Sequence, residues 1–463
     1  EGLPIDYATQ WSYGIDETMT LLIPGFNGGS VDQELSKDSH TYEALSKIDR
    51  NFAGQFIQHV NMYWGKQPGT QGPVYVGAII VFLFVLGLFI VDKRYRWWLL
   101  AATVLGIMLS WGKNFMWFTE FFMNNIPGYS KFRTVSMALV IPQITMPLLA
   151  ILALKRALFE EIKKADLIKA LKWSGGITGG LALLFLLAPS MAGNFSSTFD
   201  MRVVDAYSQG NPQLRQFFVQ NLIPALEADR EAMLRTDAFR SLVFILLAAG
   251  LIYLYRIREI KINASFLIAL FGLLFLVDMW PVNKRYLDED KFVSKSATKT
   301  PFKASAADQY ILQQPGQHDR VLNLSVSTFQ DASTSYFHHS IGGYHGAKMR
   351  RYQDLINTLL ESDISMVIHA LQTQQEDAGL MATMGNVNAL NMLNTKYIIV
   401  NPKAQPLVNP YAAGHAWFVD SFRVAENADE KIDLLAGIDI QNEIRVDKRY
   451  ADRLEGKYFH RDT

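Results

Sequence analysis

Charged residues are absent from six long stretches of the chain, and these stretches dominate its pattern of apolar and polar positions. They span residues 73–91, 97–112, 134–154, 173–199, 241–255 and 262–277. A helix needs about 20 mainly apolar residues to cross a bilayer, with roughly 17 to 25 observed. Aromatic residues such as Trp97, Trp98, Tyr253 and Trp280 flank the stretches and suit the membrane–water interface. We therefore predict six transmembrane helices within residues 73–281 rather than a set of buried helices in a soluble protein.

The distribution of basic residues predicts the orientation of these helices. The connections 92–96, 155–172 and 256–261 hold 12 Lys and Arg in 29 residues, whereas the alternate connections 113–133 and 193–240 hold 8 in 69. Cytoplasmic loops carry an excess of Lys and Arg. The first set is therefore expected to be cytoplasmic, and both ends of the chain extracytoplasmic.

The regions on either side of the apolar stretches have a different character. Residues 282–463 contain 42 charged residues in 182 and no long apolar run. Strand-like segments at 320–326, 396–400 and 416–424 alternate with helical spacing after Arg350, which predicts a soluble α/β domain. Residues 1–72 read as an extracytoplasmic loop region with a turn-rich IPGFNGGS segment, followed by one helix within TYEALSKIDRNFAGQFIQHVNMYW. The predicted fold is a polytopic α-helical membrane protein bearing an extracytoplasmic α/β domain.

The whole-chain averages exclude several other classes of protein. The 463 residues include 44 basic and 44 acidic side chains, 12% aromatic residues and no cysteine. The aromatic content and zero net charge argue against disorder, and the charge balance lacks the basic excess of a nucleic-acid binder. Disulfides and cysteine-ligated metals are impossible. The mean hydropathy of +0.07 is then a mixture of a membrane region and a charged soluble region.

Both termini suggest a piece of a longer protein. The chain begins at Glu1 rather than Met, without a signal peptide, and stops at YFHRDT without an obvious domain end. We expect an internal fragment of a larger membrane protein.

Four strings carry a resemblance to a known family. DYATQWSYGIDETMTLLIPGFNGG (6–29), FMWFTEFFMNNIPGYSKFRTVSM (115–137), MWPVNKRYLDEDKFV (279–293) and GGYHGAKMRRYQDL (342–355) resemble the YfhO family of bacterial membrane proteins as it occurs in Bacteroidetes. The resemblance covers about residues 6 to 450. It implies a longer protein of the bacterial cytoplasmic (inner) membrane, related to GT-C-type glycosyltransferases, that attaches sugars to a cell-envelope polymer or lipid from a polyprenyl-phosphate donor.

The resemblance leaves the catalytic residue unassigned. In GT-C-type enzymes an acidic residue in the first extracytoplasmic loop acts as base or metal ligand, and that loop would lie upstream of Glu1. No catalytic residue, metal site or certain cofactor is therefore assigned here, and a divalent metal would depend on upstream residues. A carboxylate pair from this chain would have to come from the outer loops, where Glu120, Asp200, Asp205 and Asp237 lie.

Lys131 and Arg133 are candidates for binding a lipid-linked phosphate at the outer membrane face. Phosphate recognition needs cations at that depth, and the neighbouring Tyr129 with Gly128 would allow close approach. The alternative is an anchor pair that reaches to lipid head groups. Asp278, near the outer end of the sixth stretch, is a second membrane-edge candidate. It would pair with a cation or accept a proton, but a helix-end carboxylate hydrated by the following loop is the favoured interpretation.

A third group of candidates lies in the predicted soluble domain. His345, Lys348, Arg350 and Arg351 surround glycines, a composition that suits an anion or sugar phosphate, although arginines paired with local carboxylates are the plainer interpretation. The histidines 338, 339 and 345 lack the spacing typical of a zinc site. GGITGG at 175–180 lacks the Lys-Ser/Thr of a phosphate loop, so we assign it to close helix packing.

The leading functional prediction is polyprenyl-phosphate-dependent glycosyl transfer, with the lipid bilayer, a lipid-linked sugar and an envelope acceptor as partners. Two alternatives stay open. A transporter or flippase for an envelope lipid is disfavoured because the middles of all six stretches lack charge. A non-catalytic membrane scaffold, with an outer domain that binds a partner, is the other.

Overall fold

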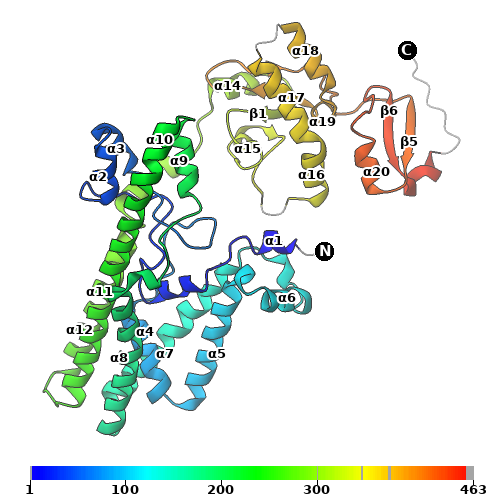
Figure 1. Cartoon of the computed structure of the whole chain (residues 1–463). Helices are drawn as coiled ribbons and strands as arrows, with labels where there is room; N and C mark the ends of the chain where they lie inside the picture. Colours follow the sequence, from blue (N-terminus) through cyan, green and yellow to red (C-terminus); the bar gives the residue numbers. More distant parts are fainter. Residues whose placement is uncertain (1–2, 300, 317, 346–347, 374–376, 455–463) are drawn as a thin grey trace. The chain divides into compact units, whose positions relative to one another are not determined.

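The computed structural model describes residues 3–299, 301–316, 318–345, 348–373 and 377–454. The chain divides into two compact units, Glu1–Phe292 and Val293–Thr463 (Figure 1). The first unit joins the predicted loop region 1–72 to the apolar region, and it also takes in residues 282–292, which the sequence pattern assigned to the soluble domain. Each unit is described by itself.

Every charge-free stretch of the sequence coincides with a helix of the first unit. In chain order these helices are α4 (Ala78–Ile90), α5 (Lys93–Ser110), α7 (Val140–Phe159), α8 (Lys164–Leu187), α11 (Ile223–Arg256) and α12 (Ala264–Lys284). The contacts of α4 are mainly with α7 and α8, and those of α11 mainly with α8. Large side chains such as Phe82, Leu86, Leu149 and Phe271 fill the core between the helices.

Four helical segments in the described residues are long and apolar enough to cross a membrane: Val135–Phe159, Lys164–Leu187, Pro212–Arg256 and Ala264–Lys284. Two stretches differ from the expectation. The helix α4 has 13 residues, or about 20 Å at 1.5 Å per residue, which is shorter than the hydrocarbon core. After α5 the chain bends by 113° into η2 (Gly112–Phe115) and α6 (Met116–Asn125), so this pair is a broken span or a re-entrant segment. A polytopic helical protein is supported, whereas six spans stay a prediction.

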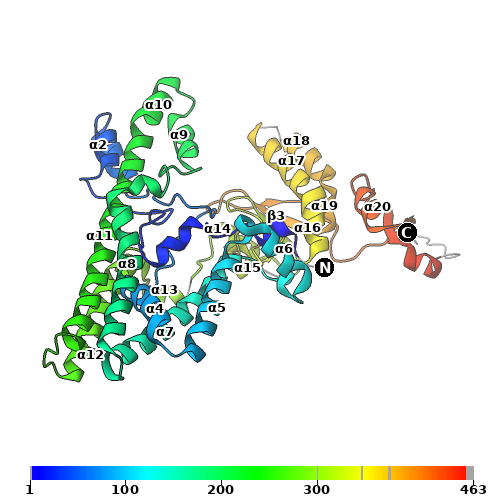
Figure 2. The same ribbon diagram turned by 60° about the horizontal axis from the view of Figure 1, so that its bottom comes forward.

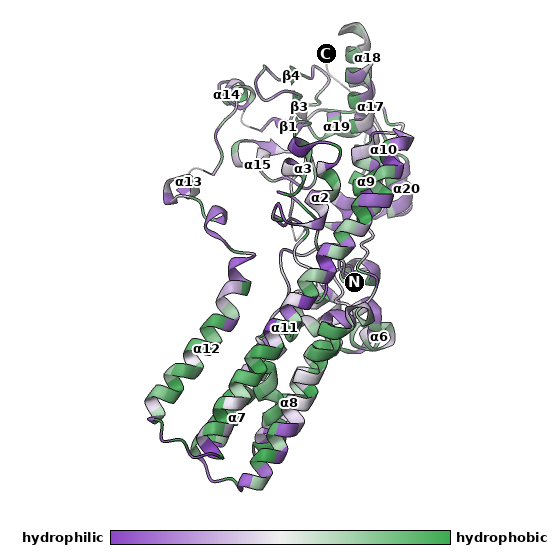
Figure 3. Cartoon of the chain, turned by 60° about the vertical axis from the view of Figure 1, so that its left-hand side comes forward, coloured by the Kyte–Doolittle hydropathy of each residue, from purple (hydrophilic) through white to green (hydrophobic). Residues whose placement is uncertain are grey.

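The outward faces of these helices are apolar. Exposed side chains on α7 and α12 include Ile144, Ile151, Phe266, Leu273 and Leu276. Figure 3 shows the apolar colour concentrated along α7, α8, α12 and the C-terminal half of α11, and polar colour at the other end of α11. A soluble monomer rarely exposes so much contiguous apolar surface, whereas a lipid environment accounts for it.

A small group of short helices packs around the N-terminal part of α11. The helices α9 (Asp200–Ser208) and α10 (Pro212–Phe217) lead through a π-helical turn, η6 (Phe218–Leu222), into α11. Phe56, Val204, Phe218 and Leu222 share a core with α2 (His40–Ser46) and α3 (Arg50–Phe56). Figure 2 shows α2, α9 and α10 gathered at this end of α11.

The single helix expected within residues 41–64 is two short helices. Asp49 breaks the pattern: its side chain accepts hydrogen bonds from the backbone N–H of Asn51 and Phe52 at 2.6 and 2.9 Å. An aspartate in this position caps the start of a new helix, α3.

The prediction that the glycines of GGITGG serve close helix packing holds only in part. Gly179 faces Leu242 and Ile245 of α11, whereas a Cβ on Gly175, Gly176 or Gly180 would meet open space.

The second unit contains a mixed sheet with strand order β2-β1-β3-β4. The strands β1 (Arg320–Asn323), β2 (His339–Ser340) and β3 (Thr395–Ile399) are parallel, and β4 (Leu407–Val408) is antiparallel to β3. A parallel pair, β5 (Ser421–Ala425) and β6 (Glu443–Asp447), forms a second small sheet.

Helices connect and cover these strands. They are α13 (Lys295–Lys299), α14 (Ala306–Leu312), α15 (Thr334–Phe337), α16 (Arg350–Leu355), α17 (Glu361–Gln372), α18 (Asp377–Asn386), α19 (Asn388–Met392) and α20 (Ala428–Asp433). Leu322 and Ile398 of the larger sheet pack against Ile356, Leu360 and Val367. The strands β1 and β3 overlap the first two expected segments, β5 begins at Ser421 within the third, and the segment after Arg350 is helical, so the second unit combines helices with small sheets.

Candidate functional site

A small polar cavity lies in the first unit, beside the N-terminal ends of α4 and α7. Its volume is about 250 Å³. We call it the polar chamber, and it is lined by Tyr13, Glu17, Thr20, Asn27, Gly28, Gly29, Tyr63, Gln67, Thr70, Gly72, Pro73, Val74, Ser136 and Met137. Ligand pockets commonly measure about 300–1,000 Å³. The polar chamber lies just below that range, so its ligand would be small, of the size of one sugar ring.

The wall of the chamber is formed by the IPGFNGG turn, and Gly28 determines how closely this turn can approach its neighbours. Gly28 has φ +80°, and a Cβ there would lie 1.9 Å from the carbonyl oxygen of Met62. Only glycine combines that backbone conformation with that contact. The backbone N–H of Trp64 donates to the carbonyl of Asn27 at 3.1 Å, which holds the turn against the segment that carries Tyr63.

Glu17 is the buried acidic group of the chamber, with 1% of its surface exposed. It lies on η1 (Asp16–Leu21). Its Oε1 accepts hydrogen bonds from the Tyr63 hydroxyl at 2.6 Å and from the backbone N–H of Lys66. Its Oε2 accepts a hydrogen bond from Gln67 Nε2 at 3.2 Å. Burial raises the pKa of Glu17 above its ordinary value, and the hydrogen bond from Tyr63 opposes that rise. A raised pKa makes the carboxylate a stronger base, which favours its use in proton transfer.

Asn27 supplies an unused hydrogen-bond acceptor. Its Nδ2 donates to Asp16 Oδ2 at 3.0 Å, but its Oδ1 is buried and has no partner among the described residues. A buried polar atom without a partner is costly and calls for an explanation such as a bound ligand. The hydroxyls of Tyr13 and Tyr63 also line the chamber, where burial raises the pKa of both; they contact Thr20 and Glu17, and each oxygen can accept a further hydrogen bond. The chamber thus offers a carboxyl group, an amide oxygen and hydroxyls, a set that suits a polyhydroxylated ligand.

A larger and more open groove adjoins the chamber. Its volume is about 810 Å³, and it shares Gln67 and Thr70 with the chamber. We call it the outer groove. Aromatic side chains of Trp11, Phe199 and Tyr207 line it, together with Arg202, whose guanidinium lies 5.2 Å from the Phe199 ring centroid. A small polar site therefore continues into a mainly apolar groove with one cation.

Three ion pairs, each with a carboxylate at most 5% exposed, involve α11: one joins it to the start of α9, and two join it to α12 and the residue that follows α12. Arg230 pairs with Asp200 at 2.7 Å, Arg285 with Asp237 at 2.7 Å, and Arg240 with Asp278 at 3.1 Å. The carboxylates proposed from sequence as an acid–base pair are therefore held by arginines rather than by one another. Asp205, likewise, pairs with Arg215 at 2.9 Å, and Glu120 is exposed on α6.

Asp278 is fully buried, so the interpretation of a helix end hydrated by the following loop is wrong. It accepts a hydrogen bond from the Tyr75 hydroxyl at 2.7 Å in addition to its pairing with Arg240. The backbone N–H of Ile79 lies 3.4 Å from its other oxygen. Asp278 therefore pairs with a cation, and its contacts join α12 to the start of α4.

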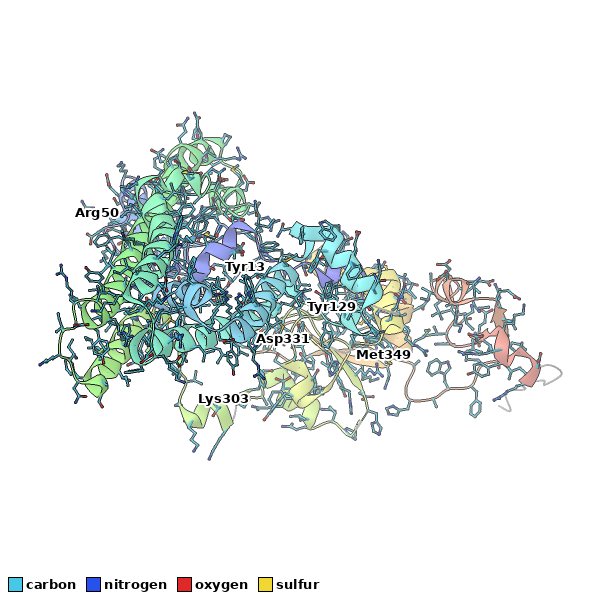
Figure 4. All side chains as sticks on the ribbon, turned by 90° about the horizontal axis from the view of Figure 1, so that it is seen from below. Tyr13, Arg50, Tyr129, Lys303, Asp331 and Met349 are labelled. Carbon is cyan, nitrogen blue, oxygen red and sulfur yellow. The ribbon has the colours of Figure 1, made fainter. Side chains whose placement is uncertain are left out.

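Lys131, Arg133 and Tyr129 follow α6 and line neither the chamber nor the outer groove. Arg133 stacks on the Tyr7 ring at 4.5 Å and donates to the Tyr7 hydroxyl at 2.8 Å. Tyr129 is half-buried against Phe122, and burial raises its pKa. Figure 4 shows Tyr13 at η1 and Tyr129 beside α6, apart from each other. Ser136, which follows soon after Arg133 in the sequence, does line the chamber.

The candidates of the second unit lie between β2 and the first turn of α16. Lys348 lies over the Phe329 ring at 5.6 Å, Arg350 and Arg351 begin α16, and His345 is exposed. Residues 346–347 between them lie outside the described residues. His338 contacts Asp308 at 2.9 Å. Within the described ranges, no group of three potential metal ligands occurs, and the two units are not placed relative to each other, so these residues are not combined with Lys131 and Arg133.

Glu17 and Asn27 were missed by the sequence analysis. Both lie in the string 6–29, which was used only for its turn and for the family resemblance. An Asp-Glu pair ten residues before Asn-Gly-Gly was the available signal, but nothing in the sequence reveals that the pair is buried against Tyr63. No protein-family model, no curated protein and no solved structure matches the chain.

Proposed function

We propose that the chain belongs to a membrane-embedded glycosyltransferase of the bacterial cell envelope, as its resemblance to the YfhO family implies, and that the polar chamber is its reaction site. The observation that carries the proposal is a buried carboxyl group with a raised pKa, beside an unused amide oxygen, in a cavity of sugar-ring size. In this proposal six helices cross the cytoplasmic membrane, and the second unit is extracytoplasmic.

The location of the chamber agrees with that orientation. It lies beside the start of α4 and α7, whereas the basic connections 92–96, 155–172 and 256–261 follow or precede the opposite ends of the helices (Figure 1). If those connections are cytoplasmic, the chamber is at the outer membrane–water interface. A polyprenyl-phosphate donor would place its sugar at that depth.

The proposed reaction is transfer of a glycosyl group to an acceptor hydroxyl. Glu17 accepts the hydroxyl proton, the acceptor oxygen bonds to the anomeric carbon, and the bond from that carbon to the phosphate oxygen breaks. The electron pair of the broken bond leaves with polyprenyl phosphate. Lys131 and Arg133 are the proposed contacts of the departing phosphate, because cations stabilise the charge that develops there. Asn27 Oδ1 would accept a hydrogen bond from a sugar hydroxyl.

The test compares Glu17→Gln with Glu43→Gln in the protein embedded in nanodiscs. Glu43 is an exposed glutamate on α2 whose carboxylate pairs with the exposed Lys47 at 3.8 Å, so its variant controls for the loss of one carboxylate. A general base typically contributes 10²–10⁴-fold to the rate. Consumption of a polyprenyl-phosphate-linked sugar should therefore fall at least about 100-fold in Glu17→Gln and stay unchanged in the control. Equal turnover in both variants would exclude Glu17 as the base. If the protein in closed vesicles moves lipid across the membrane without consuming the sugar, it is instead a transporter.

A further inference from the structure

A second cavity lies at the opposite end of the helices from the polar chamber, where the ends of the candidate spans meet. Its volume is about 700 Å³. Its walls come from the end of α11, from the connection between α11 and α12, and from the connection between α7 and α8 with the start of α8. Because helices that cross a membrane end at its surface, this cavity lies at the depth of the lipid head groups. We call it the basic pocket.

The charged side chains of the basic pocket are mostly cations. Lys164, Arg256 and Lys261 line it, with Glu259 as the opposing carboxylate. Lys164 forms an ion pair with Glu259, and this pairing lowers the pKa of the glutamate, which stays ionised at neutral pH. Both of these side chains are more than half exposed, so their pair is readily rearranged by a competing anion. The pocket carries two more cations than carboxylates.

Arg256 is held in a defined position at the pocket wall. Its Nη1 donates to the carbonyl of Leu158 at 3.1 Å and its Nη2 to the carbonyl of Glu160 at 2.9 Å. These bonds fix the guanidinium against the C-terminal end of α7, and among the described residues its positive charge has no carboxylate partner. A pre-positioned guanidinium contributes to anion binding with little loss of side-chain freedom.

Apart from Tyr255 and Asn263, the remaining lining residues are apolar. Leu167, Ile260 and Ile262 line the pocket beside the cations. A soluble anion would gain nothing from these side chains, whereas the glycerol and first acyl carbons of a phospholipid would bury them. Basic pockets between membrane helices on the cytoplasmic side are suited to anionic lipid head groups.

We propose that the basic pocket binds the phosphodiester head group of an anionic phospholipid in the membrane leaflet at that end of the helices, which the charge pattern identifies as the cytoplasmic leaflet. Lys164 and Lys261 contact the phosphate from the rim, and Arg256 contacts it from the wall. The bound lipid then joins the two connections that form the pocket. This site is independent of the polar chamber and of the proposed glycosyl transfer.

The test measures lipid binding by native mass spectrometry of the protein in mixed micelles with phosphatidylglycerol or phosphatidylcholine. The variant is Lys164→Ala with Lys261→Ala. The matched control is Lys169→Ala with Lys172→Ala, which removes two exposed lysines of α8 outside the pocket. Thermal unfolding of both variants confirms that folding is unchanged. A basic side chain near an anionic lipid surface contributes about fivefold to affinity, so phosphatidylglycerol should bind roughly 25-fold more weakly to the pocket variant.

The control should retain phosphatidylglycerol like the original protein, and phosphatidylcholine should bind weakly to all three. Glycerol 3-phosphate, which carries the phosphate without acyl chains, should not displace the lipid. Equal retention of phosphatidylglycerol by the pocket variant and the control would overturn the proposal. Displacement by glycerol 3-phosphate at equal concentration would overturn it as well, because the ligand would then be a soluble phosphate.

Discussion

Replacement of Arg230 by methionine tests how strongly buried charge holds the first unit together. Arg230 is fully buried on α11, and its two terminal nitrogens make four hydrogen bonds. Two go to the carboxylate of Asp200 at 2.7 and 2.8 Å, and two to the carbonyls of Phe195 and Asn61, both at 2.8 Å. The side chain therefore ties α11 to α9 and to the segment that leads into Tyr63 of the polar chamber.

Arg230→Met keeps an unbranched apolar stem, lacks the guanidinium end and removes all four hydrogen bonds. Asp200 is then left as a buried carboxylate, and the loss of one partner of such a pair costs about 3–5 kcal/mol. The matched control is Arg235→Met on the same helix, because Arg235 pairs with Glu231 at 2.9 Å on an exposed surface. An exposed pair at that helical spacing contributes only about 0.3–0.5 kcal/mol.

The double variant Asp200→Asn with Arg230→Met separates the two causes of destabilisation. Asparagine retains an oxygen that can accept the Ser197 N–H, now at 2.7 Å, and it carries no charge. The double variant should therefore be more stable than Arg230→Met alone. Unfolding of the protein in mixed micelles, with sodium dodecyl sulfate as denaturant, gives the three free energies. Equal destabilisation by Arg230→Met and Arg235→Met would refute the reasoning.

Three further predictions concern the polar chamber. Tyr63→Phe removes the hydroxyl that donates to Glu17, so the pKa of Glu17 should rise further and the acid limb of the pH–activity profile should shift to higher pH; an unshifted profile would contradict this. The free energy of unfolding should decrease as pH rises from the ordinary glutamate pKa of 4.5 through the raised pKa of Glu17, because the folded state binds the proton more tightly than the unfolded state. Glu17→Gln should abolish that part of the pH dependence, as chemical denaturation across this range would reveal. Gly28→Ala should destabilise the first unit by more than about 1 kcal/mol, or about fivefold in the unfolding equilibrium, because Gly28 has a positive φ and a Cβ there would contact Met62. Gly54→Ala is the control, because a Cβ there meets open space, and it should not destabilise the unit. The unfolding midpoints of the two variants test this prediction.

The helices of the first unit are largely predictable because the absence of charge is a local property of the sequence. All six charge-free stretches are helical, but the bend after Ser110 is not evident from them. There the apolar character continues through Trp117 and Phe118, while the backbone changes direction at Gly112, whose φ is +46°. An apolar run therefore predicts a helix more reliably than it predicts a crossing of the membrane.

The candidate site depends on contacts between distant parts of the chain, and these contacts carry no local signal. Asp278 illustrates the difficulty. In sequence it is a carboxylate near a helix end, where water is the expected partner, but Tyr75 and Arg240 enclose it from two other elements. Glu17 is similar, since its burial depends on Tyr63 and the following turn. Local reasoning predicted basic residues at a membrane edge, but it could not predict that Asp278 and Glu17 are buried.

The most direct test of the central claim is an electron cryomicroscopy structure of the protein in nanodiscs with a polyprenyl-phosphate-linked sugar, using Glu17→Gln to prevent turnover. The account predicts density for the sugar ring inside the polar chamber, within hydrogen-bonding distance of Asn27 Oδ1, and the phosphate on the side of Lys131 and Arg133. A sugar bound elsewhere, with the chamber empty, would contradict the account.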